Sequence, residues 1–328
     1  MSNPDFRKPI KHHNCRRAPF HDYKATGEYM ITISKAPECP DFSTLTGDPR
    51  SVEHPPCVEL SDFGKIITRK IEDIPVDWPM FEIYNHVVMP DHLHLMWKVK
   101  ERLKYDLGHY VGLFKSRCTG TIHKSLPGCA DINVFKEKYN DRIAFTPELA
   151  ERFSRYISDN PRRRLTVMLY PQLFSRAERV RILDREFDVY GNFQLLKHPM
   201  ITPAIVSSRY TPEQKERLEC ELEDTKRNRG VFISPFISAA ERELKKEILE
   251  AGGSIIRIVA DGIGPKYKPS GDEFELCAQG RCLHIGLPRP SAHKEALKRR
   301  LCLDLNDTAR WIAAHPAETL ILIGRKSR

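Results

Sequence analysis

The 328-residue sequence predicts an α+β domain built on an antiparallel sheet, followed by a smaller α/β domain. Strand-like runs rich in β-branched and aromatic residues occur in the first third of the chain. Beyond about residue 175, strand-like and helix-like segments alternate, a pattern typical of a parallel sheet with right-handed crossovers. The length also fits two domains of roughly 100–200 residues each. We therefore expect domains at residues 1–175 and 176–328.

In the first domain, residues 28–34, 81–89 and 93–99 have the composition of strands. Residues 35–60 carry several prolines and aspartates and are expected to form a long loop. A basic helix is expected over 105–124. A further helix begins at Thr146, an N-cap residue followed by Pro147, and is expected to end by Asn160 because Pro161 follows.

In the second domain, strands are expected at 204–208, 231–235 and 254–260. A charged helix opens at Thr211-Pro212 and ends near Gly230. A second helix opens at Ser238 with the pattern of a capping box and ends at 251–253. No glycine-rich phosphate-binding motif occurs in this region.

The composition limits the possible functions. The chain is 40% hydrophobic and 30% charged, as in ordinary globular proteins, so we exclude a disordered or collagen-like chain. We expect no membrane segment, because no apolar run approaches roughly 18 residues, and no secretory signal. The formal charge of +9 favours an anionic partner, nucleic acid first, although an inert basic surface is an equal alternative.

The nine cysteines are odd in number and irregularly spaced, and no CxxC pair occurs. This pattern disfavours a disulfide framework and a structural zinc site. Free thiols in a reducing cytosol fit it better.

The most informative stretch is Met89-Pro-Asp-His-Leu-His-Leu-Met-Trp97. On a strand, His92 and His94 point to one face, while Leu93 points to the other. Two imidazoles on one face provide half of a metal site, which oxygen ligands could complete for Mg²⁺ or Mn²⁺. Two surface histidines without a ligand are the alternative.

Tyr156 and Asn160 lie four residues apart on a predicted helix, so their side chains share a face. A tyrosine can act as a nucleophile through its phenol oxygen. Asn160 could supply an oxygen to a metal. Taken alone, a core tyrosine and a helix C-cap are the simpler interpretations of these two residues.

Four blocks of the chain, covering roughly residues 15–175, resemble the single-tyrosine HUH transposases of the REP-associated and insertion-sequence-200-like ("transposase 17") group. The most specific block is Val88-Met-Pro-Asp-His-Leu-His-Leu95. The other three are Gly27-Glu-Tyr-Met-Ile-Thr32, Gly112-Leu-Phe-Lys-Ser-Arg117, and Phe135 to Ile143 followed by Arg155-Tyr-Ile-Ser-Asp-Asn-Pro161. Three positions depart from the family pattern: Phe135 replaces a common Trp, Arg142 a common His and Asp91 a common Asn.

The resemblance implies that His92 and His94 are metal ligands, that Asn160 is a third ligand and that Tyr156 is the nucleophile. It implies a ferredoxin-like antiparallel sheet with helices on one face, the HUH nuclease fold. The implied reaction is Mg²⁺- or Mn²⁺-dependent cleavage and rejoining of single-stranded hairpin or repeat DNA through a 5′-phosphotyrosine. The family works as monomers or dimers, so a homodimer is a possible state. We expect a cytoplasmic, nucleoid-associated bacterial protein.

Basic residues near these motifs are candidates for binding DNA phosphates. They are Lys115, Arg117 and Lys124 on the helix after the histidines, and Arg162, Arg163 and Arg164 after Asn160. The aromatic residues Phe114, Tyr139 and Trp97 could stack on unpaired bases, although core packing is the simpler interpretation.

The second domain faintly resembles the Rossmann-like domains of DprA-type proteins. In such sheets ligands bind at the carboxyl ends of the strands, where Ser207, Ser208, Arg209 and Ser234 would lie. A scaffold or dimerisation module is the favoured interpretation, ahead of a nucleotide or DNA-end site.

Three functional hypotheses follow. The first is a DNA strand transferase with Tyr156 as nucleophile, or Tyr139 in its place. The second is a domesticated DNA-binding protein that recognises hairpins or repeats with little catalysis. The third is a metal-dependent hydrolase that uses the two histidines and forms no covalent intermediate.

Overall fold

The computed structural model describes residues 18, 20–207, 209–264, 267–288 and 299–326. Contacts between residues divide the chain into two compact units, Met1–Leu165 and Thr166–Arg328. The division falls within the last turns of helix α4 (Pro147–Leu169), about ten residues before the boundary expected from the sequence. Each unit has its own sheet and its own buried cores.

The sheet of the first unit has four antiparallel strands in the order β4-β5-β1-β6. They are β1 (Gly27–Ser34), β4 (Phe81–Val88), β5 (His92–Val99) and β6 (Asn140–Ala144). Helix α1 (Asp62–Glu72) lies between β1 and β4 along the chain, and α3 (Leu107–Ser125) lies between β5 and β6. This order of strands and helices is that of a ferredoxin-like motif. The three strands and the basic helix predicted here are confirmed.

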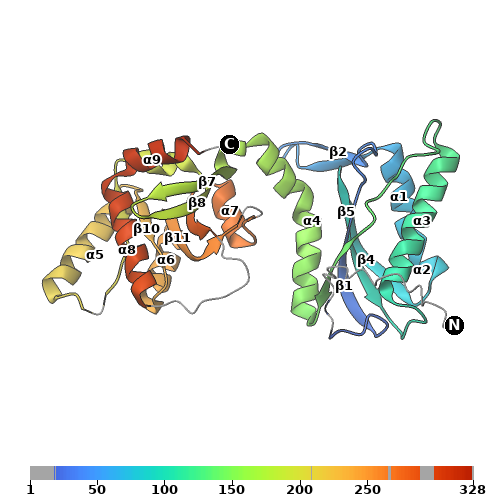
Figure 1. Cartoon of the computed structure of the whole chain (residues 1–328), viewed down its shortest axis with the longest axis horizontal. Coiled ribbons are helices and arrows are strands. Elements are labelled where there is room, and N and C mark those ends of the chain that lie inside the picture. The colour runs from blue at the N-terminus through green and yellow to red at the C-terminus, as the bar shows by residue number, and fades with distance from the viewer. Residues whose placement is uncertain (1–17, 19, 208, 265–266, 289–298, 327–328) are drawn as a thin grey trace, which may run out of the picture. The chain divides into compact units, whose positions relative to one another are not determined.

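Helices cover both faces of this sheet (Figure 1). Ile31, Leu93 and Leu95 point to the face packed by α1 and α3, in the largest core of the unit. Met30 and Met96 point to the other face, where they contact α4. Our expectation of helices on one face is therefore wrong. Strand residues on the second face are also apolar, and α4 removes them from water.

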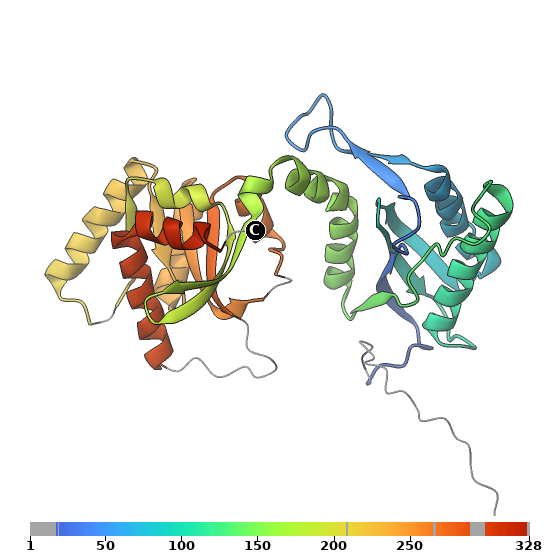
Figure 2. The same ribbon diagram turned by 45° about the horizontal axis from the view of Figure 1, so that its top comes forward.

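Helix α4 continues through Pro161 instead of ending at Asn160. Its start agrees with the sequence, because the Thr146 hydroxyl accepts a hydrogen bond from the Leu149 amide at 3.3 Å. Proline removes one helical hydrogen bond and crowds the preceding turn, which favours a bend. Figure 2 shows the ribbon of α4 bending along its second half. Burial of Leu165 and Thr166 beyond the proline offsets the cost of the lost hydrogen bond.

The expected loop at 35–60 contains a short hairpin of β2 (Ser43–Thr46) and β3 (Cys57–Leu60). Four residues per strand give a weak period-two signal, and the intervening glycine and prolines hide the pairing. Helix α1 and the one-turn helix α2 (Ile74–Asp77) were also not predicted from the sequence.

The second unit has a six-stranded mixed sheet in the order β7-β8-β12-β11-β10-β9. Strands β9 to β12 are parallel, and β8 and β7 extend the sheet in antiparallel pairing. The strands are β7 (Ser175–Ile182), β8 (Arg185–Gly191), β9 (Ile201–Pro203), β10 (Val231–Ser234), β11 (Ser254–Ile263) and β12 (Cys282–Pro288).

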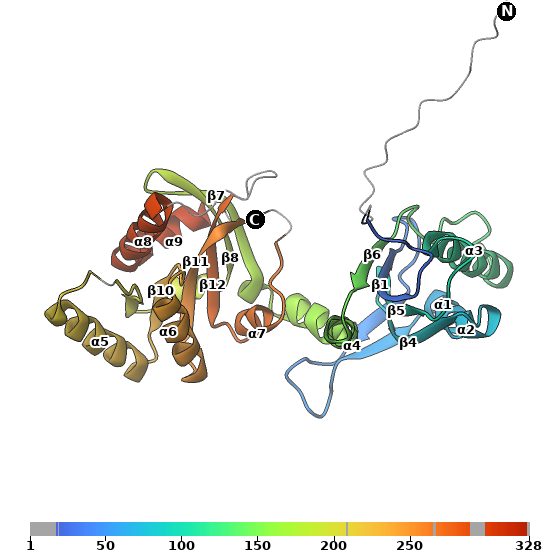
Figure 3. The ribbon, with the colours of Figure 1, turned by 90° about the horizontal axis from the view of Figure 1, so that it is seen from below.

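Helices form a layer on each side of this sheet (Figure 3). One layer holds α5 (Pro212–Arg227), α6 (Ala239–Glu250) and α7 (Asp272–Ala278). The other holds α8 (Arg299–Ala314) and α9 (Pro316–Gly324). Short 3₁₀ helices occur at Pro171–Phe174 and Phe193–Lys197.

Most sequence predictions for this unit are confirmed. Capping boxes at Thr211 and Ser238 start α5 and α6, and β10 and β11 lie where expected. The strand predicted at 204–208 is wrong, because β9 occupies Ile201–Pro203 and pairs there with β10. A doubly wound, Rossmann-like sheet is not confirmed. The described parallel strands follow chain order without the reversal that creates the ligand crevice of that fold.

Two further features concern the described residues only. None of their helices combines the length and apolar character that crossing a membrane requires. Their cysteines are free thiols, from Cys39 to Cys302.

Gly64 of α1 lies close against the backbone of Phe42, and its replacement tests how the helix docks. A Cβ at this position would lie 2.0 Å from the Phe42 carbonyl oxygen, whereas one at Gly112 on α3 would meet nothing within 4 Å. We expect Gly64→Ala to lower the free energy of unfolding by at least about 2 kcal/mol. Gly112→Ala should raise it by roughly 0.5–1 kcal/mol through helix propensity. Urea denaturation followed by circular dichroism measures both, and equal midpoints for the two variants would contradict this packing.

Candidate active site

His92 and His94 lie on β5 and point to the α4 face of the sheet. Their Nε2 atoms are 3.1 Å apart, and their ring centroids are 4.6 Å apart. Leu93 between them is fully buried in the opposite core. The alternation of a strand therefore brings the two imidazoles together, as the sequence predicted.

His94 is buried and held from behind by β1. Thr32 lies directly opposite it in the β1–β5 pairing, and the Thr32 hydroxyl is 2.8 Å from His94 Nδ1. Burial, reinforced by the neighbouring His92, lowers the pKa of His94 to about 3. The ring is therefore neutral near physiological pH. A proton held at Nδ1 would leave the Nε2 lone pair facing His92.

His92 is fixed by the residue before it. Its Nδ1 lies 2.7 Å from an Asp91 carboxylate oxygen. This hydrogen bond, together with the charge of Arg164, lowers the pKa of Asp91 to about 2, so the carboxylate is ionised and can accept a hydrogen bond from Nδ1–H of His92. The Nε2 lone pair of His92 then points to the same place as that of His94.

The two histidines fit a shared divalent cation. Metal–nitrogen bonds of about 2.0–2.1 Å place adjacent ligands about 2.9 Å apart in octahedral geometry and about 3.4 Å apart in tetrahedral geometry. The observed separation of 3.1 Å lies between these values. Thr32 and Asp91 each hold the ring nitrogen that points away from the pair, as hydrogen-bonded partners of histidine ligands typically do.

Helix α4 brings Tyr156 to the histidines. The rings of Tyr156 and His94 are 5.6 Å apart between centroids and are inclined at 67°. Tyr156 keeps 38% of its surface exposed and is therefore not a core residue. Asn160 lies one turn further along α4 and is buried. The structure thus places the phenol beside the imidazole pair, with the amide on the same side of the helix.

Residues before and after Tyr156 along α4 contact the sheet and set the position of the helix. Ala150, Phe153 and Ile157 pack on Met30 and Met96 of the sheet. The Asn85 amide of β4 donates to the Ser154 hydroxyl and backbone carbonyl and to the Ser158 hydroxyl, at 2.7–3.0 Å.

Phe135 and Arg142, which depart from the pattern of the resembled transposases, have packing roles. Arg142 stacks over the Phe153 ring at 4.6 Å, which adds a contact between β6 and α4. Phe135 is buried against Phe42, with the two ring centroids 5.6 Å apart.

Two of the three arginines after Pro161 lie beside the site. Arg163 lies 5.8 Å from the Tyr156 ring centroid, and Arg164, which is exposed, acts on the charge of Asp91. Arg162 forms a two-pronged ion pair with Asp159, with contacts of 2.5 and 2.9 Å. Part of the charge of this basic group is therefore neutralised within the helix, and its contact with DNA stays a prediction.

The basic residues of α3 lie on the opposite face of the sheet from the histidines. Lys115 donates to the carbonyls of Lys136 and Glu137 at 2.7 and 2.8 Å, and Arg117 pairs with Asp77 and stacks over Trp78. Lys124 is exposed near the end of the helix. These side chains are therefore remote from Tyr156.

The proposed base-stacking aromatics are mostly core residues. Trp97 and Phe114 are fully buried and cannot stack on DNA bases without unfolding, so that possibility is wrong for them. Tyr139, the alternative nucleophile, packs against the core on the α1 and α3 face, away from the histidines.

The polar residues proposed in the second unit form local turns. The Ser234 hydroxyl is buried and accepts the Phe236 amide at 3.0 Å, and the Ser207 hydroxyl accepts the Arg209 amide at 3.2 Å. Ser208 lies outside the described residues. These serines serve the loops after β9 and β10.

Thr32, Asn85 and Ser154 are site residues that sequence reasoning missed. Each acts through a partner more than sixty positions away, so only strand pairing and helix docking reveal it. Asp91 adjoins His92, and its position could have indicated an orienting role.

No known protein-family model matches the chain. A protein of uncharacterized function from Haemophilus influenzae is 24% identical over 172 residues, which is 46% of this chain and 89% of that protein. A REP-associated tyrosine transposase bound to a REP hairpin is similar in structure at a TM-score of 0.31 and 19% identity, covering 44% of this chain and 73% of that one. A protein of Deinococcus radiodurans, provisionally assigned as a transposase, has a TM-score of 0.26 and 14% identity over 44% of this chain and 96% of its own. TM-scores of this size do not establish a common fold or activity.

Thr32→Val is an isosteric change that tests whether β1 orients His94. It removes the partner of a buried ring nitrogen, so we expect Mn²⁺ affinity to fall about 10–100-fold. Stability should fall by about 1–3 kcal/mol. Isothermal titration calorimetry and urea unfolding measure these effects. Thr44→Val, on the exposed side of β2, is the control and should leave both unchanged. Wild-type Mn²⁺ affinity in Thr32→Val would contradict the orienting role.

Proposed function

We propose that the first domain is a metal-dependent single-stranded DNA endonuclease and strand transferase, acting through a 5′-phosphotyrosine on hairpin or repeat DNA. The observation that carries the proposal is the position of Tyr156, whose ring lies 5.6 Å from that of His94, itself in contact with His92. The four sequence blocks that resemble single-tyrosine HUH transposases support the same assignment of residues.

Tyr156 is the nucleophile in this proposal. Its phenol oxygen forms a bond to a backbone phosphorus, and the bond from phosphorus to the 3′ oxygen breaks. The phenol loses its proton and the departing 3′ oxygen gains one. The 3′ hydroxyl of a second strand can then attack the phosphotyrosine, which joins the strands and restores the phenol without an energy-supplying cofactor.

His92, His94 and Asn160 would hold a Mg²⁺ or Mn²⁺ ion. When bound, the ion polarises a non-bridging phosphate oxygen and offsets negative charge that develops at phosphorus. Thr32 and Asp91 keep both imidazoles oriented, so the site needs little reorganisation. Docking of α4 by Asn85 and the apolar residues beneath it fixes the direction of nucleophilic attack.

Arg163 and Arg164 are the basic residues best placed to contact the scissile strand. Arg163 lies beside the nucleophile ring, where a positive charge attracts both the phosphate and the attacking oxygen. Such contacts would give affinity that falls with salt and depends little on sequence. Lys115, Arg117 and Lys124 would contact DNA only if it also crossed the α3 face.

Tyr156→Phe tests the covalent step. Incubation with single-stranded hairpin DNA and Mn²⁺ should give a protein–DNA adduct on a denaturing gel for the wild type. The variant should lose the adduct by at least roughly three orders of magnitude in rate, while its DNA affinity stays within about twofold. Tyr105→Phe is the matched control, because Tyr105 is 47% exposed but belongs to the loop before α3. An adduct that persists in Tyr156→Phe would move the nucleophile elsewhere, with Tyr139→Phe the next variant to examine.

His92→Ala combined with His94→Ala tests the metal dependence. This variant should bind hairpin DNA but form no adduct at any Mn²⁺ or Mg²⁺ concentration, because the site has lost two of its three ligands. Full metal-dependent activity in the variant would reject the metal assignment.

The wild-type products separate the remaining hypotheses in the same assay. Free 5′-phosphate ends without an adduct would indicate a hydrolase. Binding without cleavage would indicate a DNA-recognition protein.

A further inference from the structure

Three potential metal ligands converge inside the second unit, outside the proposed DNA site. Cys277 lies in the last turn of α7, and Cys282 and His284 lie on the same face of β12. Their ligand atoms are all within 4.8 Å of one another. All three side chains are completely buried.

The distances within this cluster suit a tetrahedral thiophilic cation. Zinc–sulfur bonds of about 2.3 Å and zinc–nitrogen bonds of about 2.0–2.1 Å place sulfur and nitrogen about 3.5 Å apart, and two sulfurs about 3.8 Å apart. The Cys282 Sγ to His284 Nε2 distance is 3.3 Å. The Cys277 and Cys282 sulfur atoms lie within 4.8 Å of each other. Small side-chain adjustments would therefore bring all three atoms to bonding distance of one ion.

The ring nitrogen of His284 that points away from the thiols has a partner that can orient the imidazole for metal binding. Its Nδ1 lies 3.5 Å from the Tyr267 hydroxyl oxygen, which is 3.4 Å from a Glu273 carboxylate oxygen. Glu273 is in turn fixed by an ion pair with Arg257. If Nδ1 donates to Tyr267 and the hydroxyl donates to Glu273, the Nε2 lone pair faces the thiols. A hydrogen-bonded outer partner of this kind orients histidine ligands.

The surroundings also fit the charge of a zinc centre. The ligands face a core containing Phe274, Ile255 and Val259, where an uncompensated charge would be costly. Two thiolates and one neutral imidazole balance a divalent cation, so the bound site carries no net charge. Soft thiolates with imidazole favour zinc over Mg²⁺ or Mn²⁺.

We propose that Cys277, Cys282 and His284 form a zinc-class metal site that joins α7 to β12. The absence of a CxxC pair in the sequence does not exclude it, because the helix-to-strand turn at residues 279–281 brings the two cysteines together. Three protein ligands leave one tetrahedral position for a water molecule. The site is independent of the proposed DNA chemistry, since it shares no residue with the histidine pair.

The test uses the full-length protein, purified under reducing conditions, stripped with a chelator and reloaded with Zn²⁺ or Co²⁺. We expect this site to bind about one equivalent of metal tightly, besides any ion held by the histidine pair, and, with Co²⁺, to show the thiolate-to-metal charge-transfer absorption of a tetrahedral cysteine site. Cys277→Ser, Cys282→Ser and His284→Ala should lose this absorption. His284→Cys, which restores a ligand, should keep it and gain thiolate intensity.

Two sets of control variants separate this site from other sources of metal binding. Cys220→Ser and Cys302→Ser alter thiols outside the cluster and should keep the absorption. His92→Ala with His94→Ala should also keep it, which excludes the first unit as its source. Wild-type protein that shows no cobalt–thiolate absorption would overturn the proposal, as would equal absorption in Cys282→Ser. A Cys277–Cys282 disulfide detected by mass spectrometry in a parallel preparation purified without reductant would overturn it in favour of a redox pair.

Discussion

The first unit depends on one constraint, which is that the central strands β1 and β5 must be buried on both faces. One face is fully apolar and supports α1 and α3. The other carries only a short apolar patch around Met30 and Met96, and α4 covers it. Where that patch ends, the same face continues with Thr32, His92 and His94. The hydrophobic contact that holds α4 on the sheet therefore also fixes how close Tyr156 lies to the histidines.

The polar end of this face is stable because almost every buried group has a partner. A buried imidazole costs little free energy when it stays neutral. At His94, burial lowers the pKa by more than the charge of Asp91 raises it. Thr32 and Asp91 satisfy the outer nitrogens, so the inner nitrogens are left for each other or for a cation. Adjacent positions of β5 therefore have opposite requirements. Leu93 must be apolar to pack in the core, whereas His92 and His94 must be polar to bind a cation.

The sequence predicted features that depend on local spacing. The shared face of His92 and His94 follows from strand alternation, and the starts of α5 and α6 follow from Thr211 and Ser238 as N-caps. Features that depend on distant contacts were missed or misjudged. Pro161 was expected to end α4, but burial of residues beyond it outweighs one lost hydrogen bond. The pairing of Thr32 with His94, and the convergence of Cys277 with His284, arise only after strands and helices pack.

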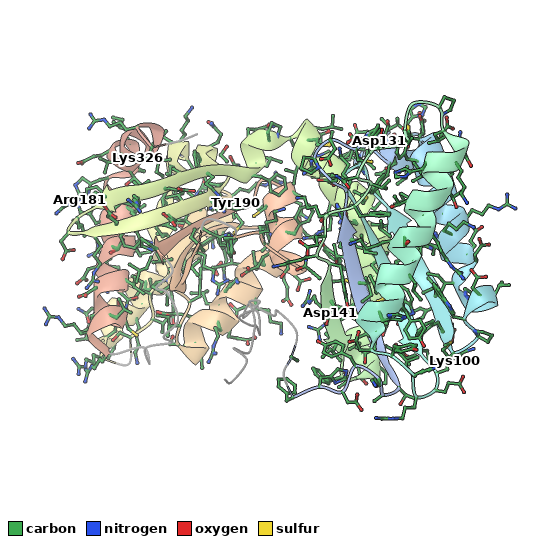
Figure 4. All side chains as sticks on the ribbon, turned by 45° about the vertical axis from the view of Figure 1, so that its right-hand side comes forward. Lys100, Asp131, Asp141, Arg181, Tyr190 and Lys326 are labelled. Carbon is green, nitrogen blue, oxygen red and sulfur yellow. The ribbon has the colours of Figure 1, made fainter. Side chains whose placement is uncertain are left out.

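In the second unit, one transverse row of side chains has a consequence for folding. Arg176, Tyr190, His284, Arg257 and Ser234 are successive partners across five strands. Tyr190, labelled in Figure 4, is the member contributed by β8. All five face the layer of α6 and α7, while their neighbours along each strand face the apolar layer of α8 and α9. A one-residue shift in the register of any of these strands would move its residue of the row to the other face, among aliphatic side chains. The row therefore favours the observed strand register over shifted ones, whatever ligand the unit binds.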